Sequence, residues 1–131
     1  MNGPLDGIKV IDLSTIVSGT LAGSLLGDQG ADVIKIESPL RPDNARFMGP
    51  IRGESGALFA AANRSKRSLA LDLKKDGSKE IIYQLIKNSD VIIDNFRPGI
   101  LKKLGLEYED VKKHNSKIIQ LSITGYGVDG P

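Results

Sequence analysis

The fold of this chain follows from the stretch Ile8–Glu37, IKVIDLSTIVSGTLAGSLLGDQGADVIKIE. It begins with a β-branched run, residues 8–13, that predicts a strand. A polar turn follows, and the pattern then predicts a helix over residues 21–28 that ends at Gly30. Residues 31–37 predict a second strand. Since strand, helix and strand in this order form a βαβ unit, we expect parallel pairing and a right-handed crossover.

Small residues recur along the predicted helix at spacings of three and four: Gly19, Ala22, Gly23 and Gly27. On a helix they form one flat stripe, against which another backbone can pack very closely. We therefore predict a packing role for the stripe rather than ligand contact. Ser18 or Thr20 is predicted to cap the helix.

The remainder of the chain continues the alternation of strands and helices. Strands are predicted over residues 69–73, 91–94 and 117–123, and helices over residues 57–62, from 76–78 onwards, 98–104 and 108–114. A proline-containing loop is expected over residues 38–56. This order predicts an α/β fold with a Rossmann-like, open, mostly parallel sheet flanked by helices, in one domain without an internal boundary.

Composition limits the class of protein. The chain has 131 residues, enough for one domain with a core, and a net charge of +2 that is too mild to indicate nucleic-acid binding. It has no Cys and one His, which excludes disulfides, cysteine metal sites and a histidine cluster, so we expect no metal. There is no apolar run of membrane-spanning length and no signal-peptide pattern, so we expect a cytoplasmic protein without membrane partners.

Cations gather in the stretch Asn63–Lys74, at four positions: Arg64, Lys66, Arg67 and Lys74. A second segment, Asp94–Gly99, also carries an arginine and also lies beside a predicted strand. Open α/β sheets bind ligands at strand ends, and lysine and arginine suit phosphates. The two segments therefore predict a site for a nucleotide-like ligand, with a solvated basic loop as the alternative.

A dinucleotide site is disfavoured by the first turn. Glu37 closes the second predicted strand, where a ribose-binding acid belongs. The turn Ser18–Gly23 nevertheless lacks the G-x-G-x-x-G pattern, whose glycines let the backbone approach a pyrophosphate. We expect no NAD or FAD site.

Five blocks, in this order and spacing, resemble the N-terminal part of the class III CoA-transferases: Pro4–Leu13, Gly30–Glu37, Asn63–Lys74, Asn95–Gly105 and Ser122–Pro131. The family includes formyl-CoA transferase, the carnitine CoA-transferases and α-methylacyl-CoA racemase. The resemblance covers essentially the whole chain. It implies that residues 1–131 are the N-terminal portion of the large CoA-binding domain, with the downstream half absent, in a protein whose two chains interlock as a homodimer.

The resemblance also implies a reaction. Family transferases move CoA from an acyl-CoA donor to a carboxylic acid acceptor through an aspartyl anhydride and CoA thioesters. Their catalytic aspartate lies downstream of residue 131, so we expect no catalytic residue here and no activity from this piece alone. Two alternatives stay open: a 2-methylacyl-CoA racemase, whose catalytic residues are also downstream, and a non-catalytic α/β module that binds CoA or a partner.

The resemblance places a coenzyme A site on residues at strand ends. It implies contacts from Val17, Ser18, Leu71, Asp72, Leu73, Lys74, Asn95, Phe96, Arg97, Lys103, Thr124, Gly125, Tyr126 and Gly127, beside the basic-stretch cations Arg64, Lys66 and Arg67. Formyl-CoA transferase has a glutamine at the position of Val17 and an arginine at that of Ser38, which argues against formyl or oxalyl specificity.

Overall fold

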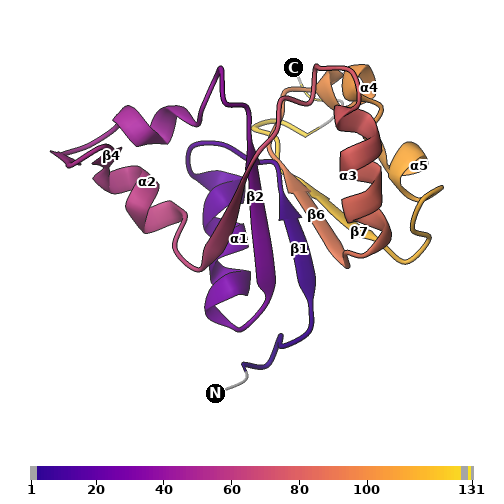
Figure 1. Ribbon diagram of the computed structural model, residues 1–131, viewed down its shortest axis with the longest axis horizontal. Helices are drawn as coiled ribbons and strands as arrows, with labels where there is room; N and C mark the ends of the chain where they lie inside the picture. Colours follow the sequence, from indigo (N-terminus) through magenta and orange to yellow (C-terminus); the bar gives the residue numbers. More distant parts are fainter. Residues whose placement is uncertain (1–2, 128–129, 131) are drawn as a thin grey trace.

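A five-stranded parallel sheet forms the centre of the computed structural model, which describes residues 3–127 and 130 (Figure 1). Its strands are β1 (Lys9–Asp12), β2 (Asp32–Glu37), β5 (Lys66–Ala70), β6 (Val91–Asp94) and β7 (Ile119–Ser122). They lie in the order β5-β2-β1-β6-β7, and every neighbouring pair is parallel. The order reverses between β1 and β6, as in doubly wound folds, so the predicted Rossmann-like parallel sheet is confirmed.

Helices cover both faces of this sheet. They are α1 (Ser18–Asp28), α2 (Ala57–Ala62), α3 (Ser78–Lys87), α4 (Ile100–Leu104) and α5 (Tyr108–Val111). Successive strand residues point to opposite faces, so Val10 joins the core on the α1 side while Ile11 joins the core under α3. Both core clusters are apolar and buried, which fixes the register of the central strands.

The small-residue stripe of α1 packs as expected. A Cβ atom on Gly23 would lie 2.9 Å from Asp12 Oδ2, and one on Gly27 would lie 2.5 Å from the carbonyl oxygen of Ser65. Real Cβ atoms essentially never come this close. The missing side chains therefore let α1 lie directly on the end of β1 and on the segment that enters β5.

Several boundaries differ from the sequence prediction. The helix α1 begins at Ser18 rather than residue 21, and neither Ser18 nor Thr20 caps it with a side chain. The third predicted strand, residues 69–73, is in fact β5 (Lys66–Ala70). It begins earlier because Lys66 and Arg67 pair with side chains of β1 and β2 and with the backbone of β2.

The segment between β2 and α2 contains more regular structure than its prolines indicate. It forms a 3-10 turn, η1 (Asn44–Phe47), and a short hairpin of β3 (Ile51–Arg52) and β4 (Ser55–Gly56). In Figure 1 this arm and α2 lie on the side of the molecule away from β6 and β7. None of the described helices is long and apolar enough to cross a membrane.

Candidate functional site

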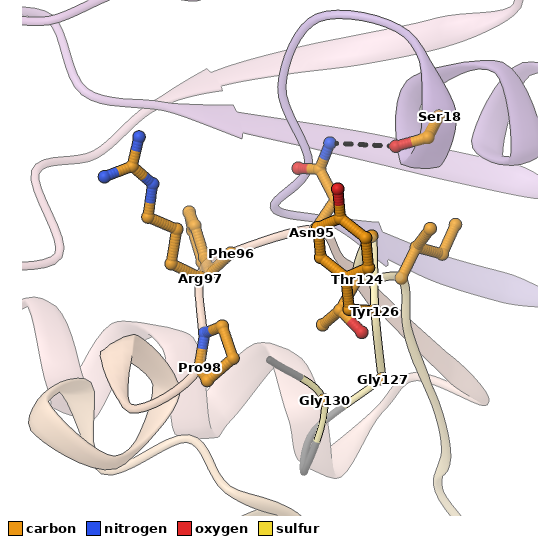
Figure 2. Close-up of a pocket in the computed structure, with 11 residues that line it drawn as sticks. Ser18, Asn95, Phe96, Arg97, Pro98, Thr124, Tyr126, Gly127 and Gly130 are labelled. Atoms are coloured by element: carbon orange, nitrogen blue, oxygen red, sulfur yellow. Dashed lines mark hydrogen bonds between the residues drawn. The ribbon is translucent and has the colours of Figure 1, made fainter.

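A cavity of about 530 Å³ opens at the switch point of the sheet, where the carboxyl ends of β6 and β7 meet the start of α1 (Figure 2). Its lining comes from three segments: Ser18; Asn95, Phe96, Arg97 and Pro98; and Ile123, Thr124, Gly125, Tyr126, Gly127 and Gly130. We call it the first cavity. Ligands of open α/β sheets bind at this position because the strand order reverses there and leaves a crevice.

Asn95, in the lining of the first cavity, is hydrogen-bonded to the loop that follows β1. Its Oδ1 accepts a hydrogen bond from the amide of Thr15 at 2.8 Å, and its Nδ2 donates to the carbonyl of Thr15 at 2.8 Å. Nδ2 also donates to Ser18 Oγ at 3.1 Å, the bond drawn in Figure 2. The amide therefore fixes the relative position of the segments after β1 and β6.

Asp94 joins the ends of β6 and β7. This buried carboxylate accepts from the amide of Phe96 at 3.2 Å and from Ser122 Oγ at 2.6 Å. Its two bonds orient the turn that carries Arg97 into the cavity lining. Within the described residues, the exposed guanidinium of Arg97 has no hydrogen bond or ion pair, so it is available to an anionic ligand.

A second opening, the lysine cavity, lies between α4 and the segment that leads into α3. It has a volume of about 700 Å³ and is lined by Lys74, Lys75, Lys79 and Lys103, with Leu73 and two acids, Asp76 and Glu80, also in the wall. Four lysines against two acids give this lining a net positive charge, which favours a polyanion such as a phosphate chain. Lys103 lies on α4, which begins three residues after Arg97. Residues 95–98 line the first cavity and residues of α4 line the lysine cavity, so the continuous segment 95–104 borders both.

Most of the predicted site residues gather in these two cavities. The first contains Ser18, Asn95–Arg97 and Thr124–Gly127, and the second contains Leu73, Lys74 and Lys103. Val17 directly precedes α1. Leu71 packs against the core under α3, and Asp72 Oδ1 accepts from the amide of Lys74 at 3.1 Å, so these two shape the turn that presents the lysines.

Three predicted cations lie elsewhere. Arg64 pairs with Asp28 at 2.6 Å and Arg67 with Asp32 at 2.7 Å. Lys66 pairs with Asp12 at 2.7 Å, and its side chain is only 2% exposed. Both Lys66 and Arg67 begin β5; Arg67 stays at that amino end, away from the edge that carries the cavities, while the ammonium of Lys66 reaches Asp12 at the end of β1 and is buried there. The structure gives these cations internal partners, and we leave Arg64, Lys66 and Arg67 out of the proposed site.

Glu37 has an internal partner as well. Its carboxylate accepts from Arg46 Nη2 at 2.5 Å and from the amide of Asp43 at 2.8 Å. Burial raises the pKa of Glu37, but the hydrogen bonds from Arg46 and from the Asp43 amide outweigh it, and the pKa lies below its usual value of 4.5. The acid at the position expected for ribose binding instead anchors the 3-10 turn.

Sequence reasoning missed a second buried ion pair. Lys35 Nζ lies 3.0 Å from Asp43 Oδ2, with side chains 3% and 0% exposed. Burial raises the pKa of Asp43, but the amides of Ala45 and Ile16 and the ammonium of Lys35 outweigh it, so the pKa lies below 3.8. The sequence signal was Lys35 itself, a charged residue at an inward position of a buried strand.

These lowered pKa values predict a loss of stability in acid. Asp43 and Glu37 each have a lower pKa folded than unfolded, so their stabilisation is complete above the usual values of 3.8 and 4.5 and is lost as the pH falls through the folded-state values. We expect urea unfolding to show a free energy that decreases below about pH 4, and less steeply in an Asp43→Asn variant. Glu54→Gln, at the exposed hairpin turn, is the control and should keep the wild-type slope. An unchanged slope for Asp43→Asn would contradict the assignment.

Within the described residues, no group of three or more His, Cys, Asp or Glu could hold a metal ion. His114 stacks on Tyr83, with ring centroids 3.9 Å apart, and so has a packing role. The two cavities bring lysine and arginine side chains, which suit anionic ligands, next to a lining that includes small and polar residues.

Comparison with known proteins agrees with this geometry. Residues 5–131 match the model of CoA-transferase family III, and the chain belongs to this family. It is 40% identical to an acetyl-CoA:oxalate CoA-transferase of Acetobacter aceti, over 98% of this chain and 33% of the relative. It is 44% identical to a succinate–glutarate CoA-transferase of Agrobacterium fabrum, over 98% of this chain and 34% of the relative.

A solved structure supports the same assignment. The crystal structure of a CAIB/BAIF family protein from Brucella suis matches with a TM-score of 0.93 and 46% identity, over 100% of this chain and 36% of that one. The family that the five sequence blocks resemble is thus confirmed. The chain spans about a third of the length of the curated relatives named here.

Proposed function

We propose that this chain is the CoA-binding part of an enzyme that moves CoA from an acyl-CoA donor to a carboxylic acid acceptor. One observation carries the proposal: a lysine-rich cavity and a cavity lined by small residues adjoin the same segment, residues 95–104. Coenzyme A has the matching form, with phosphates at one end and a thin thiol-bearing arm at the other. The family and the relatives, several of which are named CoA-transferases, support it.

The phosphates of CoA are assigned to the lysine cavity. Lys74, on the turn before α3, and Lys103, on α4, are both in its lining. Hydrogen bonds between an ammonium and a phosphate are charge-assisted and about twice as strong as neutral ones. Arg97, in the lining of the first cavity, suits the pyrophosphate or the 3′-phosphate because its guanidinium can bind two oxygens at once.

The pantetheine arm and the thioester are assigned to the first cavity. Gly125 has open space where a side chain would begin, and Gly127 has a φ of +80° that favours glycine, so the turn after β7 exposes its backbone. A narrow amide-bearing arm can pass close to such a turn. Asn95 and Ser18 provide polar groups on the opposite wall.

The chemical step needs a carboxylate that attacks the thioester carbonyl and expels the CoA thiolate, which forms an acyl anhydride. The thiolate then attacks the enzyme carbonyl of that anhydride, releases the donor acid and leaves an enzyme thioester. The acceptor carboxylate then attacks the enzyme thioester and releases the thiolate, which attacks the acceptor carbonyl of the new anhydride to give the product acyl-CoA and the free enzyme carboxylate. We assign this nucleophile to the aspartate that family members have beyond the segment matching residues 1–131. The residues of this chain bind and orient the CoA.

The arrangement in a full-length protein follows from the same proposal. The chain would form the N-terminal portion of the large CoA-binding domain, and two full-length chains would interlock as a homodimer in the cytoplasm. Transfer is favoured over racemisation of 2-methylacyl-CoA because the relatives named above are transferases. One of them is an oxalate enzyme, so we draw no acceptor preference from Val17 and Ser38.

Replacing Arg97 or Lys74 by alanine should weaken CoA binding about tenfold or more, because each charge-assisted contact contributes about 1.5–3 kcal/mol. Isothermal calorimetry with CoA measures this. Arg67→Ala is the matched control, since it removes an exposed cation that pairs with Asp32 at the other end of the sheet. Wild-type affinity in both test variants would contradict the placement of the ligand.

A further inference from the structure

The loop between β1 and α1 contains a backbone conformation that its residue disfavours. Ile16 has a φ of +66°, in the left-handed region. A β-branched residue is rarely found there, because its Cβ substituents crowd the neighbouring peptide groups. Such strain persists only where the surrounding structure holds it, and it clusters at functional sites.

Side chains hold this loop at every peptide group from residue 14 to residue 16. The amide of Ser14 donates to Asp12 at 2.9 Å, and its carbonyl accepts from Lys35 Nζ at 2.8 Å. Asn95 binds both backbone groups of Thr15. The two backbone groups of Ile16 also have side-chain partners. The N–H and C=O of all three residues, six groups in total, are therefore bound by side chains of other segments.

Asp43 holds the strained residue itself. Its two carboxylate oxygens accept from the amide of Ile16 at 2.9 Å and 3.1 Å, while Thr20 Oγ1 donates to the carbonyl of Ile16 at 2.8 Å. Asp43 is in turn paired with Lys35, which binds the carbonyl of Ser14. One buried ion pair therefore reaches two successive peptide units of the loop.

Neither Asp43 nor Lys35 is in the described lining of the first cavity or of the lysine cavity, yet both bind the loop that leads to Ser18, which is in the lining of the first. Ile16 is two residues before Ser18, which is part of the lining of the first cavity. If Ile16 relaxed to a negative φ, the chain direction at Val17 and Ser18 would change. The bond from Asn95 Nδ2 to Ser18 Oγ would then be lost, and Asn95 directly precedes Phe96 and Arg97 of the same lining.

We propose that Asp43, supported by Lys35, is a positioning residue for the CoA site: it holds Ile16 in the left-handed conformation and so sets the wall formed by Ser18 and Asn95. This rests on the proposed function, because it assigns the wall to CoA. The ion pair and the strained residue act together. A residue that accepts a positive φ without strain would make the carboxylate dispensable for binding.

The test asks whether glycine at position 16 makes the carboxylate of Asp43 dispensable for CoA binding. Asp43→Asn replaces one carboxylate oxygen by a donor that faces Lys35, and it should lower CoA affinity about tenfold, the worth of one charge-assisted hydrogen bond. Ile16→Gly in the same background should restore affinity to within about threefold, because glycine adopts a positive φ readily. A purely structural role predicts no such rescue, since Ile16 is 38% exposed and contributes little packing.

Asn115→Ala is the matched control. It removes two hydrogen bonds to the carbonyls of Ile86 and Ser89, away from the loop, so it should lower stability without changing CoA affinity. Wild-type affinity in Asp43→Asn, absent rescue by glycine, or an equal loss of affinity in Asn115→Ala would each overturn the inference. A wild-type protein that binds no CoA would overturn the proposed function first, and the positioning role with it.

Hydrogen exchange provides a measurement that needs no variant and no ligand. The amide of Ile16 lies outside regular secondary structure, yet its bond to buried Asp43 should slow its exchange about a hundredfold or more relative to an unstructured peptide. Exchange at the unprotected rate would show that Asp43 does not hold the loop, even if Asp43→Asn fails to fold.

Discussion

Replacing Lys66 by methionine is expected to lower the free energy of unfolding by about 3–5 kcal/mol, the cost of leaving a buried charge without its partner. Lys66 Nζ lies 2.7 Å from Asp12 Oδ2, with side chains 2% and 0% exposed. It also donates to the carbonyls of Thr20 and Ala62 and to Asn63 Oδ1. Methionine keeps an unbranched apolar chain up to the ε position and lacks the ammonium, so most of the loss comes from the ion pair and its hydrogen bonds.

The pKa of Lys66 indicates how strongly this site depends on the pair. Burial lowers the pKa of Lys66, and the charge of Asp12 and its hydrogen bond counteract this only in part. The ammonium is therefore buried at a cost, which Asp12 offsets more than any other single group. Since each partner makes burial of the other tolerable, removing either one should be more damaging than removing both.

Urea unfolding followed by circular dichroism measures the effect. A double variant, Asp12→Asn with Lys66→Met, removes both charges and should recover part of the loss. Arg67→Met is the matched control, because it breaks an ion pair whose side chains are 64% and 44% exposed and should cost at most about 1 kcal/mol. A Lys66→Met protein as stable as that control would show that the pair contributes little.

The same residue shows where sequence reasoning reached its limit. In the sequence, Lys66 is one cation in a basic stretch, and its neighbours indicate a phosphate site. Its partner, Asp12, is 54 positions away, and the two meet because β1 and β5 lie on either side of β2 and because α1 packs over them at Gly23. Local composition gives the charge of a side chain but not the three-dimensional partner that decides its role.

Other parts could be predicted because their cause is local. The short apolar segments Val91–Asp94 and Ala57–Ala62 were predicted as a strand and a helix, and the structure has both with these bounds. The segment after β6 was assigned to a ligand site because open α/β sheets bind ligands at strand ends, while the segment after β7 was added through the family resemblance; the structure places both in the lining of the first cavity. The 3-10 turn anchored by Asp43 was missed because its partners, Ile16 and Lys35, lie on two other segments.

Residues 1–131 alone are expected to transfer no CoA between an acyl-CoA and a free acid, and not to racemise 2-methylacyl-CoA, even where they bind CoA. Transfer needs a carboxylate against the thioester carbonyl, and racemisation needs an acid–base pair around the α-carbon. The described lining of the first cavity contains no carboxylate. Asp12 and Asp43 are buried in ion pairs and Asp94 is hydrogen-bonded to Ser122, while Asp129 lies outside the described residues.

The measurement is mass spectrometry of the chain incubated with an acyl-CoA and a free carboxylic acid, with the new thioester as the product sought. CoA binding by the same preparation, and its loss in Arg97→Ala, separates an inactive folded protein from an unfolded one. Product formation that is faster than in a protein-free control, and that persists when the protein is purified further, would place a nucleophile within these residues.

Glu107 and Glu109 would then be the first residues to replace by glutamine, because they line a third cavity together with Arg97 and Thr124, which also line the first cavity. Activity that disappeared in one of these two variants would identify the nucleophile and overturn the assignment of catalysis to a different segment.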